Sequence, residues 1–263
     1  MPEGHTVHRT AGQFKKNFQG KEISVSSPQG RFTDAPVISG STLLGAEAWG
    51  KQLFLHFEPA ILRIHLGIYG KWGWAKFDSE PNEPRGQVRA RFLSSGVVAD
   101  LRGPTACELL LAESLTDITG KLGPDPLRPD PSGFEKLRFV ERVTRSKVAI
   151  GQLLMDQSVL AGVGNVYRAE LLFRAKLSPY TPGEMVPSEL VAAIWDDAVE
   201  LMQIGVRRGL MLTRDGFLKG AVPIKNRYYV YKREGLGCRE CDTEISIALM
   251  ATRKLYWCNK CQR

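Results

Sequence analysis

Two closely spaced cysteine pairs near the end of the chain constrain the fold more than any other feature of this sequence. Each pair reads Cys-x-x-Cys, and sixteen residues separate Cys238 and Cys241 from Cys258 and Cys261. This spacing is typical of a zinc ribbon, in which two short turns bind one structural Zn²⁺ through four thiolates. Two disulfides are the alternative. The fifth cysteine, Cys107, has no neighbour at metal-ligand spacing and is expected to be a buried apolar residue.

The net charge indicates a polyanionic partner. Lysine and arginine total 36 against 28 aspartate and glutamate residues, which gives a formal charge of +8. Nucleic acid is the first partner to expect for such a chain, although a solvated basic surface gives the same count. The chain has no apolar run of 18 residues and no basic, apolar leader, so neither a membrane span nor a signal peptide is expected. Cysteines at metal spacing fit a reducing compartment, and we expect a cytoplasmic location.

The pattern of apolar residues changes from strands to helices along the chain. Apolar residues recur with a helical period over 6–18. Short strands broken by glycine, proline and serine are predicted at 22–26, 43–48, 52–57, 62–66, 88–93 and 97–101. After a proline-rich stretch at 122–131 the period is helical again, and Ser188 is predicted to cap a helix that ends near Gly209.

These patterns predict a multi-domain α+β protein. Successive short strands favour a sandwich or barrel over a parallel sheet. We therefore expect an N-terminal β-sandwich with an N-terminal helix at 1–122, followed by a linker at 123–132. A helical domain is expected at 133–235, and the zinc ribbon at 236–263 follows it.

The first residues are candidates for covalent chemistry. The chain starts Met1-Pro2-Glu3, and methionine aminopeptidase removes methionine before a small residue such as proline. Its removal would expose Pro2 as a secondary amine, and because α-amino groups have a pKa of about 8, a usable fraction is nucleophilic at neutral pH. Attack on a carbon with aldehyde character gives an iminium cation, and the adjacent Glu3 could transfer protons. Taken alone, this start is also common without chemical meaning.

Residues 154–170 form a second constellation. A helix is expected to end near Asp156, followed by a glycine-containing turn and another helix with Asn165 as its N-cap. Gly162 and Gly164 would let backbone N–H groups approach an anion, which a helix N-terminus favours. The stretch is a candidate DNA-phosphate site, and an ordinary helical hairpin is the alternative.

Five short motifs, in this order, resemble the Fpg/Nei family of DNA glycosylases, and the match runs through the whole chain. They are Pro2-Glu3, Gly50-Lys51, the stretch 122–127, the stretch 156–170, and Arg253 followed by Cys258-Asn-Lys-Cys261-Gln. The resemblance implies a helix–two-turn–helix in the helical domain and a zinc finger after it. It also implies an enzyme of base excision repair that removes damaged bases and cuts the strand.

The resemblance further implies roles for individual residues. Pro2 would attack C1′ of the damaged nucleotide and expel the base, with Glu3 transferring protons and Lys51 assisting. Elimination at the β and δ positions would then cut the strand. Asn165 and Arg253, with Lys51, match the family's phosphate contacts. The base has to be flipped because C1′ is unreachable within the stacked duplex. The implied partner is damaged double-stranded DNA of the nucleoid, and a monomer is expected.

Other details are similar to the endonuclease VIII (Nei) branch of the family. The opening Pro-Glu-Gly and the stretch 65–70 resemble it, so Ile68 and Tyr69 are predicted to fill the space of the flipped base; core strand positions are the alternative for this pair. The Fpg branch usually has an Arg-Arg-Phe-Gly loop, but here Arg102 stands without the phenylalanine. These features favour oxidised pyrimidines as substrates. Thr6 occupies a position where the family commonly has a second glutamate, which puts efficient ring opening or lyase chemistry in question.

Three other functions stay open on the sequence alone. They are an Fpg-type glycosylase for oxidised purines, a zinc-ribbon DNA-binding protein without catalysis, and an inactive family member that only binds lesions. Pro2, Glu3 and Lys51 favour a catalyst over both binding proteins. The four histidines show no metal spacing and are expected to be structural or surface residues: His5, His8, His56 and His65.

Overall fold

The computed structural model describes residues 2–263, and the chain divides into two compact units, Met1–Lys121 and Leu122–Arg263. The predicted loss of Met1 concerns a residue outside this range. Each unit has its own hydrophobic core. The finer expected bounds, with a separate linker, helical domain and zinc ribbon, stay predictions.

Unit 1 is an antiparallel β domain preceded by a long helix, α1 (Gly4–Phe18). Its eight strands are hydrogen-bonded in the order β5-β7-β6-β1-β2-β3-β4-β8. The strands are β1 (Glu22–Ser26), β2 (Ser41–Trp49), β3 (Gln52–Phe57), β4 (Ile61–His65), β5 (Lys71–Lys76), β6 (Val88–Ser94), β7 (Val97–Arg102) and β8 (Ala106–Leu110). Two short helices complete the unit, α2 (Ala35–Ile38) and α3 (Ala112–Gly120).

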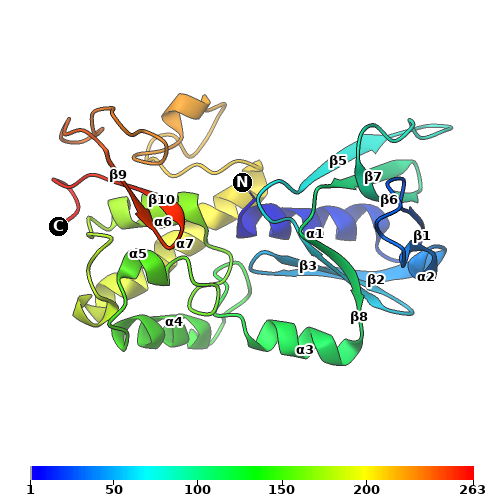
Figure 1. Cartoon of the computed structure of the whole chain (residues 1–263), viewed down its shortest axis with the longest axis horizontal. Coiled ribbons are helices and arrows are strands. Elements are labelled where there is room, and N and C mark those ends of the chain that lie inside the picture. Colours follow the sequence, from blue (N-terminus) through cyan, green and yellow to red (C-terminus); the bar gives the residue numbers. More distant parts are fainter. Residues whose placement is uncertain (1) are drawn as a thin grey trace. The chain divides into compact units, whose positions relative to one another are not determined.

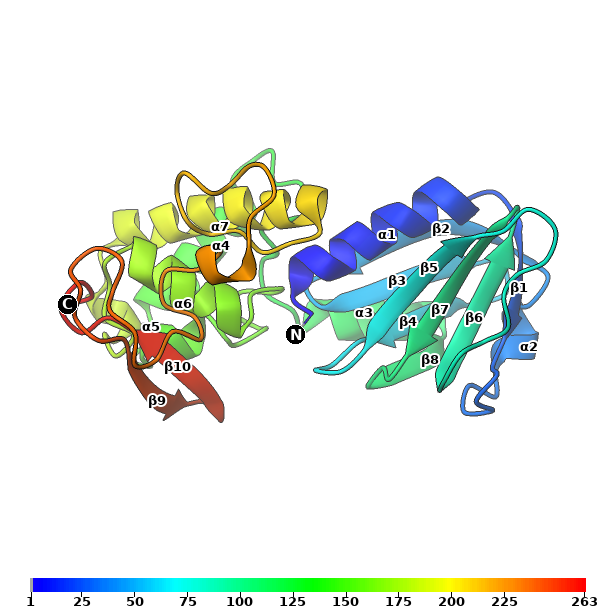
Figure 2. The same ribbon diagram turned by 90° about the horizontal axis from the view of Figure 1, so that it is seen from above.

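Helix α1 lies along the strands of this unit (Figure 2), and its buried apolar residues belong to the core. The ring of Phe14 is fully buried and lies 5.0 Å from Trp72, 5.1 Å from Trp74 and 5.5 Å from Phe92, measured between ring centroids. The same helix packs against β2 and β3, so it contacts strands from both halves of the sheet order. Because β1 and β2 share only two residue pairs, the two four-stranded halves can fold over this helix and a common core.

Unit 2 is helical and ends in a β-hairpin (Figure 1). Phe139 and Trp195 stack in its core with their ring centroids 5.7 Å apart. Its elements are α4 (Phe134–Thr144), α5 (Ile150–Leu153), α6 (Asn165–Arg174), η1 (Gly183–Met185), α7 (Ser188–Arg208), η2 (Ile224–Asn226), β9 (Ser246–Met250) and β10 (Arg253–Trp257). Strand β10 packs directly against α6. The predicted order of a β domain with an N-terminal helix, a helical domain and a cysteine-bearing hairpin is confirmed.

Several predicted element ends need correction. Helix α1 begins at Gly4 rather than residue 6, and Ser188 is the first residue of α7, with Pro187 in the cap position. The end of α7 is as expected, because Gly209 adopts a left-handed φ of 67° that terminates the helix. Strands β5 and β8 and helices α2 to α4 were not individually predicted; most residues of β5 and β8 are half-buried or exposed and show no strict alternation.

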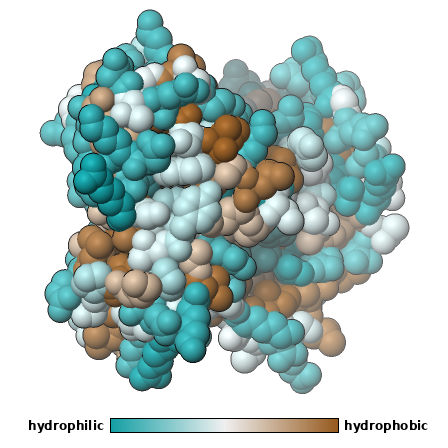
Figure 3. All heavy atoms as spheres, turned by 60° about the vertical axis from the view of Figure 1, so that its left-hand side comes forward, coloured by the Kyte–Doolittle hydropathy of each residue, from teal (hydrophilic) through white to brown (hydrophobic). Residues whose placement is uncertain are grey.

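The surface carries no continuous apolar face in the view of Figure 3, where hydrophilic side chains surround separate apolar patches. Within residues 2–263, no helix combines the length and the apolar character needed to cross a membrane. Among the described residues, Tyr69 is the aromatic side chain with the largest exposed fraction, 84%.

Candidate functional site

Pro2 and Glu3 lie immediately before α1. Glu3 is in the N-cap position with extended backbone angles, φ −124° and ψ 179°, and its side chain is buried. The carbonyl of Glu3 accepts a hydrogen bond of 2.9 Å from the amide of Thr6. Pro2 is half-buried. The positive end of the helix dipole stabilises a negative charge at this position, which suits a carboxylate held beside the amino terminus.

Lys51 lies at the tip of a tight hairpin. Trp49 and Gln52 are paired, so the loop between β2 and β3 consists of only two residues, Gly50 and Lys51. Gly50 has a φ of 58°, as the first central residue of a type II′ turn requires. This glycine therefore fixes the direction in which the strands present Lys51, which is half-buried.

Ile68 and Tyr69 lie in an exposed turn between β4 and β5, not in a core strand. Their side chains are 42% and 84% exposed. Glycines on either side define the turn: a Cβ on Gly67 would lie 1.9 Å from the Thr105 hydroxyl oxygen, and one on Gly70 would lie 2.2 Å from the carbonyl oxygen of Leu66. The alternative of core positions is therefore wrong, and the turn presents two large side chains on a constrained backbone.

The turn that precedes α6 is organised by a glutamine side chain. The amide of Gly162 donates to Oε1 of Gln157 at 3.0 Å, and Nε2 of Gln157 donates to the carbonyl of Val163 at 3.0 Å. The Gly162 N–H is thus used within the turn, so the expectation that it approaches an anion is wrong. Asn165 is the first residue of α6, and Gly164 takes the cap position expected for it.

The side chain of Asn165 connects this helix to the β9–β10 hairpin instead of capping it. Its Nδ2 donates to the carbonyl of Lys254 at 2.8 Å. Arg168, one turn further along α6, donates to Oδ1 of Asn165 and, at 3.1 Å, to the same Lys254 carbonyl. Arg168 also donates to the carbonyl of Met250 at 3.4 Å and is fully buried. These contacts fix the hairpin, and with it Arg253, relative to the N-terminus of α6.

The hairpin tip places Arg253 directly after a strained turn. Ala251 and Thr252 both have positive φ angles, 48° and 61°, which glycine or asparagine usually supplies in a two-residue turn. Met250 and Arg253 are paired across it. Asn165 still has one N–H donor beyond its bond to Lys254, since a carboxamide carries two. Asn165 and Arg253 thus offer an amide and a guanidinium on two elements that are connected to each other.

The four cysteines of the two Cys-x-x-Cys pairs form one cluster. Their sulfur atoms all lie within 4.8 Å of one another, with Cys238 3.9 Å from Cys261 and Cys241 3.5 Å from Cys258. These separations are far longer than a disulfide bond of about 2.0 Å, so the disulfide alternative is wrong. They bracket the value of about 3.8 Å that four sulfurs at 2.3 Å from a tetrahedral metal would have. The cluster therefore fits a metal ion.

Gln262 joins this cluster to the rest of unit 2. Its Oε1 accepts from the amide of Cys258 at 2.9 Å, and its Nε2 donates to the carbonyl of Leu177 at 3.0 Å. Cys107 stands apart on β8, half-buried against the core of unit 1. Cys107 is thus only half-buried, where full burial was expected; burial is still the main cause that raises the pKa of its thiol to about 12, so it stays protonated.

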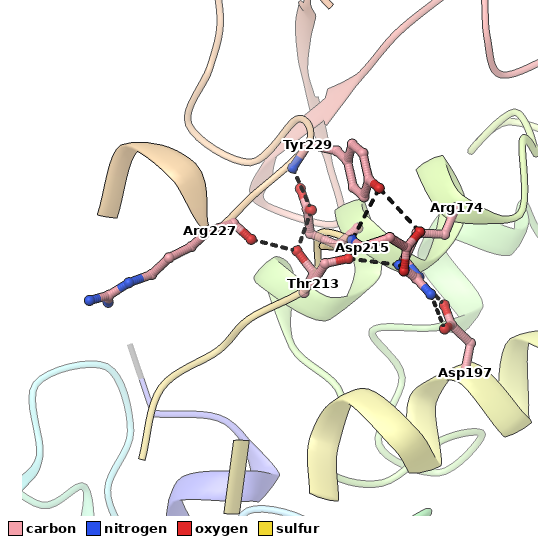
Figure 4. A network of polar contacts seen from close by, with 7 residues as sticks. Arg174, Asp197, Thr213, Asp215, Arg227 and Tyr229 are labelled. Atoms are coloured by element: carbon pink, nitrogen blue, oxygen red, sulfur yellow. Dashed lines mark hydrogen bonds and ion pairs between the residues drawn. The ribbon is translucent and has the colours of Figure 1, made fainter. Parts of the chain in front are cut away.

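A second polar network, on the C-terminal half of α6, holds the two ends of the segment 213–229 (Figure 4). The fully buried carboxylate of Glu170 accepts the Thr213 hydroxyl at 2.5 Å and the amides of Tyr229, Val230 and Tyr231 at 2.7 to 2.9 Å. Burial raises the pKa of Glu170, and these four hydrogen bonds oppose that shift.

Arg174 completes the network one turn beyond Glu170. It forms two bonds of 2.7 and 2.8 Å with Asp197 on α7, and it donates to Asp215 and to the Thr213 carbonyl at 2.8 Å each. Burial alone would lower the pKa of Arg174, but the hydrogen bonds to Asp197 and Asp215 raise it overall. The guanidinium is therefore permanently charged and binds α6, α7 and the base of the segment together.

Comparisons with known proteins identify the family to which this fold and these site residues belong. The formamidopyrimidine-DNA glycosylase N-terminal domain matches residues 1–107, and the formamidopyrimidine-DNA glycosylase H2TH domain matches residues 122–215. Endonuclease 8 1 of Mycobacterium tuberculosis is 45% identical to this chain over 270 residues, covering 100% of both proteins. The chain belongs to the Fpg/Nei family of DNA glycosylases. The resemblance inferred from the five motifs is confirmed.

This Fpg/Nei family member is more similar in sequence to an endonuclease 8 than to an Fpg relative. The formamidopyrimidine-DNA glycosylase of Thiobacillus denitrificans is 30% identical over 278 residues, also at full length, against 45% for the mycobacterial endonuclease 8. Among solved structures, Lactococcus lactis Fpg in complex with abasic-site DNA has a TM-score of 0.80 at 23% identity and covers 99% of each chain, which shows the shared fold. Fpg from Thermus thermophilus has a TM-score of 0.77 at 27% identity.

Sequence reasoning missed the buried charged residues of the Fpg/Nei helix α6. Arg168 and Glu170 are both fully buried, although a charged pair within a helix normally marks its solvent face. No signal in the sequence marks them, because the stretch looks like an ordinary amphipathic helix with four polar or charged residues: Asn165, Arg168, Glu170 and Arg174. A helix that is buried all round can only retain such charges if each has a partner.

Proposed function

We propose that this chain is a bifunctional DNA glycosylase and AP lyase of base excision repair, of the endonuclease VIII type. The observation that carries the proposal is the full-length identity of 45% to a mycobacterial endonuclease 8. The described site residues agree with it: a buried carboxylate beside the amino terminus, an exposed aromatic turn, and a metal-binding hairpin joined to the helix–two-turn–helix. The substrate is damaged double-stranded DNA, with oxidised pyrimidines favoured.

The proposed chemistry begins at Pro2 once Met1 has been removed. The secondary amine attacks C1′ of the flipped nucleotide, the base leaves, and an iminium forms between the Pro2 nitrogen and C1′. Glu3, held in the buried cap position, transfers protons to and from the sugar. The iminium withdraws electrons from C2′, which allows β-elimination of the 3′ phosphate and then δ-elimination of the 5′ phosphate. Lys51, at its fixed hairpin tip, assists as a cation near the reacting phosphate.

Ile68 and Tyr69 are proposed to fill the space left by the flipped nucleotide. Their exposure and the rigid turn around them support this role, since a wedge has to enter the stack without folding back on itself. The absence of the Fpg-type phenylalanine from the loop that contains Arg102 supports the preference for pyrimidines. Arg102 itself is held within unit 1, because it donates to Asp100 at 2.9 Å and to the Arg85 carbonyl at 3.2 Å.

The metal is proposed to be one structural Zn²⁺ bound by Cys238, Cys241, Cys258 and Cys261. Four thiolates leave no open position, so the ion would supply no chemistry to the reaction and would only stabilise the fold. Its proposed effect is indirect: the hairpin between the two pairs carries Arg253, and Gln262 ties the second pair to the carbonyl of Leu177. The monomeric state and the cytoplasmic location stay predictions.

Arg253 and Asn165 are proposed to bind phosphates of the DNA, which gives a measurable salt dependence. Arg253→Ala is expected to weaken binding of every lesion duplex by a similar factor, because phosphates carry no base identity. The slope of log affinity against log salt concentration should fall by roughly 0.9 for each lost contact. Fluorescence anisotropy over a salt series measures both quantities.

Arg145→Ala is the matched control for this measurement. Arg145 is exposed and has only a long ion pair of 3.9 Å with Glu141, so its removal subtracts the same charge elsewhere on unit 2. The control is expected to leave the salt slope almost unchanged. A change of lesion preference in Arg253→Ala at unaltered affinity would contradict the phosphate assignment.

Borohydride trapping on a panel of single-lesion duplexes tests the proposed function as a whole. The processed protein should form a covalent adduct with duplexes that contain an oxidised pyrimidine or an abasic site, and end-group analysis should show phosphates on both sides of the gap. Faster trapping with oxidised purines would instead establish the Fpg-type alternative. Tight binding without any adduct would establish a DNA-binding protein without catalysis.

A further inference from the structure

Arg168 on α6 has no role in the chemistry proposed above. It is fully buried, and it lies three residues after Asn165, so both side chains project from the same face of the helix. Burial of a guanidinium costs free energy that its hydrogen bonds have to offset, and an apolar side chain of similar length would fill the same space. Packing alone therefore does not account for an arginine at this position.

The stronger hydrogen bonds of Arg168 come from one nitrogen. Its Nη2 donates to Oδ1 of Asn165 and, at 3.1 Å, to the carbonyl of Lys254. Its Nη1 donates to the carbonyls of Gly151 and Met250, but both of these bonds are 3.4 Å long and correspondingly weak. The better-bonded half of the guanidinium thus serves Asn165 and the carbonyl that Asn165 itself contacts.

The two partners of the Asn165 carboxamide determine which way it points. Its Nδ2 donates to the Lys254 carbonyl at 2.8 Å, and its Oδ1 accepts from Arg168. A carbonyl only accepts hydrogen bonds and a guanidinium only donates them. A carboxamide rotated by half a turn would therefore set oxygen against oxygen and N–H against N–H. The chemistry of its partners leaves this amide a single favourable orientation.

This orientation decides what Asn165 presents to a ligand. One N–H of Nδ2 is bonded to Lys254, and because the amide group is planar, the direction of the second N–H is fixed as well. Asn165 is the first residue of α6, where the helix dipole favours an anion, and 6% of its surface is exposed. In the reversed orientation the carbonyl oxygen would replace this N–H and repel a phosphate.

We propose that Arg168 is a positioning residue that holds the Asn165 carboxamide with an N–H donor toward a phosphate of the DNA. It acts through Asn165 and does not touch the DNA, because its side chain is fully buried. The same nitrogen holds the carbonyl of Lys254, the residue after Arg253 on β10, so one guanidinium orients the amide and fixes the strand that carries a second phosphate contact. The inference rests on the proposed function, because it needs Asn165 to bind a phosphate.

Methylphosphonate interference tests this role. A methyl group replaces one charged oxygen of a single phosphate in a duplex that carries a tetrahydrofuran abasic analogue, which has no C1′ oxygen and is not cleaved. Each phosphate around the lesion is replaced in turn, and affinity is measured by fluorescence anisotropy. In the wild type, one position should show a loss of about tenfold that disappears in Asn165→Ala, because either change removes the same charge-assisted hydrogen bond. This position is the reporter phosphate.

Two substitutions of Arg168 separate the orientation of Asn165 from the other contacts of the guanidinium. Arg168→Met removes every donor, so the carboxamide loses one of its two restraints, and interference at the reporter phosphate should fall to about threefold or less. Arg168→Lys should retain most of it, because one ammonium nitrogen can donate to both oxygens that Nη2 now holds. Both variants lose the Nη1 bonds alike, so a difference between them belongs to Asn165 and Lys254.

Tyr167→Phe is the matched control. Tyr167 is the neighbouring buried residue on α6, and its hydroxyl donates at 3.4 Å to the carbonyl of Leu201 on α7 rather than to the hairpin. The substitution removes a buried hydrogen bond of the same helix and should leave the interference pattern unchanged. Melting temperature and bound metal are measured on every variant, so that a loss of fold is not mistaken for a loss of orientation.

The outcomes distinguish the positioning role from the function on which it rests. If Arg168→Met folds and keeps the full interference at the reporter phosphate, the positioning role is wrong and the phosphate contact of Asn165 stands. If no phosphate depends on Asn165 in the wild type, the contact itself is overturned. Should Arg168→Met fail to fold, Arg168→Lys decides: retention of the pattern supports the role, and its loss from a folded lysine variant contradicts it.

Discussion

Any residue retained ahead of Pro2 is expected to reduce both base excision and cleavage of abasic sites to background. An added residue converts the Pro2 nitrogen into an amide, whose lone pair is delocalised into the carbonyl group and cannot attack C1′. Proteins with and without a cleavable N-terminal extension are compared on the same lesion duplexes. DNA binding should survive in the extended form, because the phosphate contacts belong to other residues.

Two substitutions distinguish the role of the Pro2 amine from the role of the Glu3 carboxylate. Pro2→Gly should keep part of the activity, since glycine offers a primary amine. Glu3→Gln should keep the amine, so excision of a damaged base is expected to fall far more than cutting of a preformed abasic site. Peptide mapping of the trapped complex should locate the adduct on Pro2. Full activity with a retained extension, or an adduct on Lys51, would overturn the mechanism.

Cys258→Ser is expected to remove the metal and abolish DNA cleavage while unit 1 stays folded. Structural zinc sites contribute about 10–16 kcal/mol of apparent binding free energy, which far exceeds what a two-stranded hairpin gains by itself. Without the ion, the β9–β10 hairpin should lose its register, and Arg253 would no longer be fixed relative to α6. Elemental analysis, far-UV circular dichroism and cleavage assays measure the three effects.

Cys107→Ser is the control for this substitution. Cys107 lies on β8 in unit 1 and outside the cluster, so its replacement should keep the metal and most of the activity. An active wild-type protein that contains no zinc would end the structural-metal proposal. Retention of full cleavage by a metal-free Cys258→Ser protein would show that the hairpin does not need the ion.

The sequence predicted those elements whose ends carry strong local signals. The bounds of β1 and β3 are as expected, because apolar residues alternate in β1 and because Gly50 precedes and Pro59 follows the apolar run of β3. The cysteine cluster was equally predictable, because the spacing of the ligands already encodes two turns. Strand β5 was not, because the run Trp72-Gly73-Trp74 lies half-buried with no alternation, and only pairing with β7 defines it.

The candidate site was less predictable wherever a side chain acts over a long range. Asn165 was expected to cap its own helix, a local role, but its amide bonds to Lys254 in the hairpin. Gly162 was expected to offer its N–H to an anion, but the side chain of Gln157 occupies it. Local propensity describes what a residue can do with its neighbours, and these contacts depend on which distant segment the fold brings near.

Helix α6 has a consequence for the order in which the chain folds during synthesis. Several partners of its buried polar residues are encoded far downstream: Thr213 lies 43 residues after Glu170, and Lys254 lies 89 residues after Asn165. A ribosome therefore finishes α6 long before Glu170 can accept its hydrogen bonds from Thr213 and from the amides of residues 229–231, so we expect this helix not to pack stably in the nascent chain. Strand β8 pairs with β4 by Leu110, so the first unit can close early. Completion of the second unit has to wait until the last strand has left the exit tunnel.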